Sequence, residues 1–197
     1  MFEEYLEETE YVDYSNPNVK ELAKTLKEQS EDEISLIKNT YHYVRDKTHH
    51  PYDIQDKRVT VTASDVLKEG VGICWAKSNL LAALLRANGI PSGFSYQKLT
   101  LGGSPDTGYC IHSLNTVYIP SLKKWIRLDA RGNTKDIQAE FSLTEEKLCF
   151  KADIKGEIDY HDNHPAPDKK LMRILKENND AFELCFYNMP DSLEYYE

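Results

Sequence analysis

The chain lacks any hydrophobic run that could cross a membrane. A membrane-spanning helix needs ~20 apolar residues, and among the longest apolar runs in these 197 residues is Leu80 to Leu85. Met1 is followed by Phe2-Glu3-Glu4 rather than by a basic segment and then an apolar one. We therefore expect no signal peptide and no membrane partner.

The chain is also short of positive charge. Lys and Arg number 24 against 33 acidic residues, which gives a formal net charge of −9. A nucleic-acid backbone or an anionic lipid surface repels such a chain, and no stripe of Lys or Arg offsets the imbalance. We therefore expect no nucleic-acid partner and again no membrane.

Cysteines are few, and none is spaced for a metal site. The four are Cys74, Cys110, Cys149 and Cys185. No CxxC pair occurs, His161 and His164 lack a third ligand cluster, and no EF-hand pattern is present. These absences predict no metal and no cofactor. Without an export signal we expect reduced thiols and a cytoplasmic location; in a secreted chain the four thiols could pair.

Helical patterns fill the first half of the chain. Asn16-Pro17 predicts a helix start, because Asn caps a helix and Pro suits the first helical position. A capping box at Ser30-Glu31-Asp32-Glu33 predicts a second helix, which ends near Thr48. Further predicted segments are a polar connection over 49–63, a short helix over 62–70 and the strongest helix over 74–88.

The second half of the chain shows alternation typical of strands. The predicted segments are a strand over 93–101, a hairpin of 109–119 with 125–130, an irregular region over 131–167 with one short helix near 144–148, and a last helix after Asp168. Helices before antiparallel strands predict an α+β fold, with N-terminal helices packed on an antiparallel sheet. The length suits a single domain over 1–197.

Cys74 is the first candidate for chemistry. It stands where the turn Gly70-Val71-Gly72-Ile73 enters the predicted helix over 74–88. Unpaired backbone N–H groups and the helix dipole favour negative charge there, and the thiolate is the reactive form of cysteine. The alternative is a buried cysteine that packs as a small apolar side chain.

His112 and Asp129 are the candidates for a base and its orienting partner. His112 lies in an apolar strand, where an imidazole is costly unless it is hydrogen-bonded. A hairpin turning near 120–124 places Asp129 opposite residues 113–116, and the near end of that range permits a direct hydrogen bond to His112. Each residue alone has a structural alternative, a satisfied core histidine and a turn-capping aspartate.

With these residues the sequence resembles the transglutaminase-like superfamily of papain-like cysteine enzymes. The similar blocks are Tyr43-Val44-Arg45-Asp46, Gly70-Val71-Gly72-Ile73-Cys74-Trp75, Leu81-Ala82-Ala83-Leu84-Leu85-Arg86-Ala87-Asn88-Gly89-Ile90-Pro91 and Trp125-Ile126-Arg127-Leu128-Asp129. They define a motif-bearing core over about residues 34–131.

The resemblance implies a papain-like fold, the transglutaminase core, with a Cys–His–Asp triad. In it Cys74 is the nucleophile, His112 the base and Asp129 the orienting partner. One block departs from the family: where relatives have His-Ala-Trp-x-Glu, this chain has His112-Ser113-Leu114-Asn115-Thr116. This block keeps the histidine, but it leaves the substrate specificity undetermined. It also leaves open the alternative that this chain is a degenerate, non-catalytic member of the family.

The oxyanion hole is predicted to use the backbone N–H of Cys74, because that group lies at a helix N-terminus. The sequence does not identify the second donor. Tyr52 is a candidate, since an aromatic residue often precedes this site in the family; a surface tyrosine is the alternative. Trp75 is predicted either to pack against the sheet or to shield the site from water.

These residues together predict a cysteine-dependent acyl-transfer enzyme with a thioester at Cys74. The favoured reaction is hydrolysis of an amide bond in a peptide or protein substrate, as in a cysteine peptidase or amidase. The alternatives are amine transfer to protein glutamine, which is transglutaminase activity, and a catalytically silent module that binds peptides. The sequence leaves the oligomeric state open.

Overall fold

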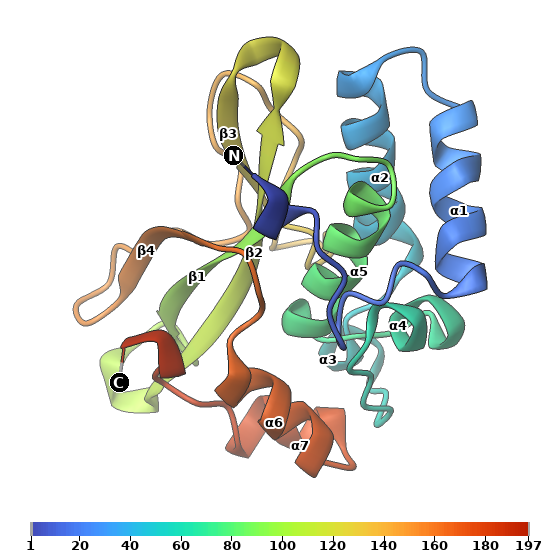
Figure 1. Cartoon of the computed structure of the whole chain (residues 1–197). Helices are drawn as coiled ribbons and strands as arrows, with labels where there is room; N and C mark the ends of the chain where they lie inside the picture. Colours follow the sequence, from blue (N-terminus) through green and yellow to red (C-terminus); the bar gives the residue numbers. More distant parts are fainter. Residues whose placement is uncertain (1, 197) are drawn as a thin grey trace.

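The computed structural model describes residues 2–196, and Figure 1 shows their arrangement. The α-helices are α1 (Pro17–Glu28), α2 (Glu33–Lys47), α3 (Pro51–Ile54), α4 (Ala63–Glu69), α5 (Cys74–Arg86), α6 (Lys169–Glu177) and α7 (Ala181–Tyr187). The strands are β1 (Ser92–Thr100), β2 (Tyr109–Ile119), β3 (Lys124–Leu128) and β4 (Ile158–His164). Single 3₁₀ turns lie at Glu3–Tyr5, Pro105–Thr107, Pro120–Leu122 and Glu194–Tyr196.

Helix α5 is the centre of the core. All 13 of its residues are buried, and it packs against α1, α2 and α4 as well as against β1 and β2. Alanine and leucine favour the helix, and its polar side chains are buried with partners elsewhere in the fold. After α5 the chain reverses at Gly89, whose φ of +77° is a conformation that glycine adopts without strain.

The sheet is antiparallel, in the order β3-β2-β1-β4. Strand β3 pairs only with Asn115–Ile119, so the first half of β2 has no strand on that side. At this edge the Ile111 carbonyl accepts from the Trp75 indole (2.9 Å), and the Ile111 N–H donates to the Pro190 carbonyl (2.9 Å). The edge is therefore covered by the start of α5 and by the C-terminal segment, which brings Cys74 close to β2.

The predicted α+β class is confirmed, with helices packed on an antiparallel sheet. The Asn16 cap of α1 is confirmed as well. The predicted capping box is wrong: α2 is capped two residues later, where Asp32 accepts from the Ser35 N–H (2.8 Å) and the Ser35 hydroxyl accepts from the Asp32 N–H (2.9 Å). Ser30 instead donates to the Leu26 carbonyl and so completes the end of α1.

The region over 131–167 differs most from the prediction. No helix forms at 144–148; the Ser142 hydroxyl accepts from the N–H groups of Thr144 and Glu145 in a turn. Strand β4 lies within this region and was not predicted, since its polar sequence lacks alternation. Helices α3 and α7 were also not predicted, and the strand expected to reach Ala130 ends at Leu128.

Within residues 2–196 we find no helix with both the length and the apolar character needed to span a membrane.

Candidate active site

A cavity of about 640 Å³ lies where the start of α5 meets β2 and the segment after β3. Its walls include apolar side chains such as Leu99 and Phe150, together with two imidazoles, His50 and His112. All four cysteines of the chain also line it, although they come from four separate segments. The cavity therefore collects every thiol of the protein in one place.

Cys74 is the first residue of α5, and its side chain lines this cavity although it is only 5% exposed. The preceding Ile73 offers no side-chain cap, so the positive end of the helix dipole faces the sulfur without a competing acceptor. The approach to α5 needs glycine at position 72, because a Cβ there would lie 3.0 Å from Thr60 Oγ1 and 3.1 Å from Val66 Cγ2. Local sequence thus places the sulfur where a negative charge is stabilised.

His112 lines the same cavity and forms a buried hydrogen bond with Asp129. The distance from His112 Nε2 to Asp129 Oδ2 is 2.9 Å. The same carboxylate accepts from the backbone N–H groups of Cys149 (2.9 Å) and Arg131 (3.1 Å), and the Phe150 ring packs edge-on against the imidazole. These contacts fix the ring plane of His112, and Nε2 is committed to Asp129.

The pKa values follow from this arrangement. Burial lowers the pKa of His112, but the charges of Asp129 and Cys74 and hydrogen bonds to both raise it to about 10. Burial raises the pKa of Asp129, yet the His112 charge and the hydrogen bonds it accepts leave that pKa below its ordinary value. The site therefore favours a protonated imidazole beside the Asp129 carboxylate.

The other three thiols have pKa values above the ordinary value for cysteine. Burial raises the pKa of Cys110 and of Cys185 to about 12, and the nearby charge of Cys74 adds to the shift. Burial, and then the charge of Asp129, raises the pKa of Cys149 even further. These three thiols stay protonated at neutral pH, so they are poor nucleophiles.

Two buried basic side chains hold the loops around the site, and sequence reasoning missed both. Lys77, fully buried on α5, donates to the backbone carbonyls of Thr48 (2.5 Å), Arg131 (2.7 Å) and Arg45 (3.4 Å). The guanidinium of Arg131 binds both carboxylate oxygens of Asp53 in α3, at 2.9 Å each. The segment that carries Asp129 is thus tied to α2, α3 and α5; a lysine inside an apolar helix was the only sequence signal.

The structure separates the two aromatic candidates. Trp75 is 1% exposed, and its indole N–H already donates to the Ile111 carbonyl, so it packs against the sheet and is not among the cavity residues. Tyr52 lines the cavity but is 47% exposed, and its ring lies against Phe182 and Phe186 of α7. Of the two roles expected for Trp75, these contacts favour packing against the sheet.

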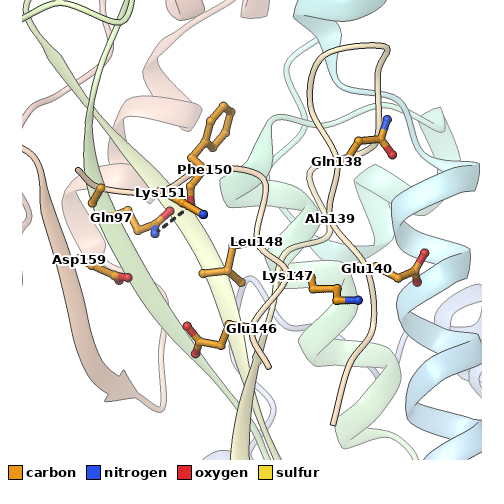
Figure 2. Close-up of a pocket in the computed structure, with 11 residues that line it drawn as sticks. Gln97, Gln138, Ala139, Glu140, Glu146, Lys147, Leu148, Phe150, Lys151 and Asp159 are labelled. Atoms are coloured by element: carbon orange, nitrogen blue, oxygen red, sulfur yellow. Dashed lines mark hydrogen bonds between the residues drawn. The ribbon is translucent and has the colours of Figure 1, made fainter. Parts of the chain in front are cut away.

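A second cavity, of about 550 Å³, adjoins the first and shares Phe150 and Lys151 with it. Figure 2 shows Gln97, Glu146 and Asp159 around it, with the Gln97 amide donating to the Phe150 carbonyl (3.4 Å). Gln97 pairs with His112 across β1 and β2, so the second cavity continues from the imidazole along the sheet.

No cluster of metal-ligating side chains occurs among residues 2–196. Of the two histidines weighed from the sequence, His164 stacks on Tyr195 with ring centroids 3.8 Å apart. That ring contact is consistent with a structural role.

Comparison with known proteins bears on the fold and the family. The sequence profile of the transglutaminase-like superfamily matches residues 20–130. No curated protein matches the chain. A solved structure from Cytophaga hutchinsonii, described as a candidate cysteine protease, is similar at 20% identity and a TM-score of 0.53, over 64% of this chain and 40% of that one. This likeness shows the fold.

Two further structures match less closely. The periplasmic domain of TgpA from Pseudomonas aeruginosa, bound to ethylmercury, gives 19% identity and a TM-score of 0.46, over 64% of this chain and 46% of that one. A structure described as a TGase gives 18% identity and a TM-score of 0.44, over 64% of this chain and 34% of that one. The chain spans less than half the length of all three structures.

Proposed function

Because the chain belongs to the transglutaminase-like superfamily, we propose that it transfers acyl groups through a thioester at Cys74. The observation that supports the proposal is the buried hydrogen bond between His112 Nε2 and Asp129 Oδ2, beside a cavity that both His112 and Cys74 line. In this assignment Cys74 is the nucleophile, His112 the proton carrier and Asp129 the group that orients the imidazole.

The first half-reaction forms the thioester. The Cys74 sulfur, having passed its proton to His112, attacks the substrate carbonyl carbon, and the carbonyl π electrons move onto oxygen. When the intermediate collapses, the C–N bond breaks and the protonated His112 gives its proton to the leaving amine or ammonia. The raised pKa of His112 supports this role, since the ring holds the proton until the leaving group takes it.

The second half-reaction releases the acyl group, and we propose water as the acceptor. His112 takes a proton from water as its oxygen attacks the thioester, and the Cys74 thiolate leaves. Hydrolysis is favoured because water needs no binding site, whereas an amine acceptor must be bound before it can compete. A peptide or protein amide is the proposed substrate; amine transfer and peptide binding without turnover are the competing outcomes.

A glutamine-containing peptide tests these assignments. We expect ammonia or cleaved fragments without any added amine, detected by mass spectrometry and an ammonia assay. Product that depends on a primary amine and carries it would identify a transferase instead. Cys74→Ala should abolish turnover, whereas Cys110→Ala, the same change on the same cavity, should retain it. If wild type and Cys74→Ala bind peptides but neither turns them over, the enzyme proposal is wrong.

A further inference from the structure

The proposed thioester chemistry needs a second donor for the oxygen that becomes negative. Oxyanion holes commonly use two donors about 2.7–3.1 Å from that oxygen, and the N–H of Cys74 supplies only one. The other side-chain N–H or O–H groups on the cavity belong to His50, Tyr52, Thr100, His112, Arg131 and Lys151. Tyr52 and Lys151 are exposed, and His112 is already assigned as the proton carrier. The Thr100 hydroxyl donates to Glu157 and Arg131 is committed to Asp53, which leaves His50 as the buried candidate.

The backbone places His50 beside the start of α5. His49 forms an isolated parallel bridge to Val71, with its N–H donating to the Gly70 carbonyl and its carbonyl accepting from the Gly72 N–H. Successive side chains of an extended segment point in opposite directions. Accordingly His49 is exposed, whereas His50 is 9% exposed and lines the cavity with Cys74, which follows Gly72 by two residues.

The hydrogen bonds of His50 define which ring nitrogen carries its proton. As the N-cap of α3, its Nδ1 accepts from the Tyr52 N–H (3.3 Å), so a neutral ring holds its proton on Nε2. Burial, and then the charges of Arg131, Lys77 and His112, keep the pKa of His50 well below its ordinary value. Among residues 2–196 no hydrogen-bond partner is found for Nε2.

We propose that His50 donates the second hydrogen bond of the oxyanion hole from Nε2–H, which makes it a further catalytic residue; this inference rests on the proposed function. As the Cys74 sulfur bonds to the carbonyl carbon, the π electrons move to oxygen, which accepts from the Cys74 N–H and from His50 Nε2–H. His50 keeps its proton throughout, and both hydrogen bonds are released when the carbonyl re-forms.

The surroundings of His50 suit a fixed donor. Its Nδ1 is held by α3, and α3 is held by the two hydrogen bonds from Arg131 to Asp53. The backbone N–H of Arg131 also donates to the carboxylate of Asp129. The positions of His50 and of Asp129 therefore both depend on Arg131. A donor fixed before the substrate arrives costs no reorganisation in the transition state.

Two substitutions separate the capping role of His50 from the proposed catalytic one. In His50→Asn the side-chain oxygen replaces Nδ1 and keeps the cap of α3, but nothing replaces Nε2. In His50→Gln the side-chain amide reaches the place of Nε2 while the cap is lost. With p-nitrophenyl acetate as the acyl substrate, we expect kcat to fall on the order of 10²–10³-fold in His50→Asn, with KM little changed, and His50→Gln to recover most of that loss.

Controls distinguish this inference from the function it rests on. His49→Asn, on the exposed neighbour, should keep wild-type kcat, and alkylation of Cys74 by iodoacetamide should be unchanged in both His50 variants because it forms no oxyanion. If His50→Asn keeps wild-type kcat and His50→Gln loses it, His50 only caps α3. If kcat falls in Tyr52→Phe and in neither His50 variant, the tyrosine is the donor. Either result overturns this inference but leaves the proposed function standing. Absence of both turnover and selective Cys74 alkylation in wild type would overturn the proposed function and the inference with it.

Discussion

Asp129→Asn removes the buried carboxylate while keeping its shape. The carboxylate receives three N–H donors: His112 Nε2 and the Cys149 N–H on Oδ2, and the Arg131 N–H on Oδ1. An asparagine has one acceptor oxygen and one amide group that only donates. Whichever way it is turned, at least one of these buried N–H groups faces another donor and loses its partner.

The magnitude follows from these contacts. An unsatisfied buried donor costs about 1–3 kcal/mol, and each charge-assisted hydrogen bond contributes about 1.5–3 kcal/mol. Because the three bonds share one residue they do not add fully, and we expect a loss of about 3–5 kcal/mol in the free energy of unfolding at neutral pH. The pKa of His112 should fall, because the charge of Asp129 is a main cause of its raised value.

The pH dependence of this loss has a defined sign. The pKa of Asp129 is lowered in the folded state, so its contribution is present above its unfolded value of 3.8 and is lost as pH falls through the folded pKa. The pKa of His112 is raised, so its contribution is present below 6.5 and is lost as pH rises through about 10. The difference between wild type and variant should therefore be largest between pH 3.8 and pH 6.5, and it should shrink as the pH moves away from this window in either direction.

Chemical denaturation measures the stability, and NMR titration of the histidine signals measures the pKa of His112. Labelling with iodoacetamide measures the reactivity of Cys74. If the pair of Cys74 thiolate and protonated His112 loses about 1.4–2.7 kcal/mol of stabilisation, labelling of Cys74 at pH 7 should be roughly 10- to 100-fold slower. Asp191→Asn, the same change at an exposed ion pair, should alter stability by less than about 1 kcal/mol. Wild-type stability and labelling in Asp129→Asn would refute the orienting role of the carboxylate.

Two further predictions follow from the electrostatics of the site and its supports. At pH 7 iodoacetamide should label Cys74 first and the other three thiols far more slowly, since burial raises their pKa values; peptide mass spectrometry measures this, and equal rates at all four would contradict an activated thiol. Lys77→Met should lower the free energy of unfolding by about 2–4 kcal/mol, because three backbone carbonyls lose their donor. Lys68→Met, at an exposed lysine, is the matched control, and equal unfolding midpoints for the two variants would remove the support assigned to Lys77.

Short-range patterns in the sequence determined a large part of the site. Helical periodicity and the glycine turn place Cys74 at the start of α5. The hairpin pattern puts Asp129 one residue beyond the Asn115–Leu128 pair and so beside the strand that carries His112. These features involve elements that are neighbours or near neighbours along the chain. For such elements, the periodicity of apolar side chains and the residues in the turns are sufficient to predict the arrangement.

Only the tertiary structure decided what surrounds these residues. The four cysteines meet at one cavity, Lys77 reaches loops 29 and 54 residues away along the chain, and β4 pairs with β1 across a long connection. Whether a lysine, an arginine or a histidine such as His50 is buried depends on partners that lie far off in the sequence. Local propensity carries no information about such partners, because the free energy of a buried polar group is set by the hydrogen bonds it finds after the chain has packed.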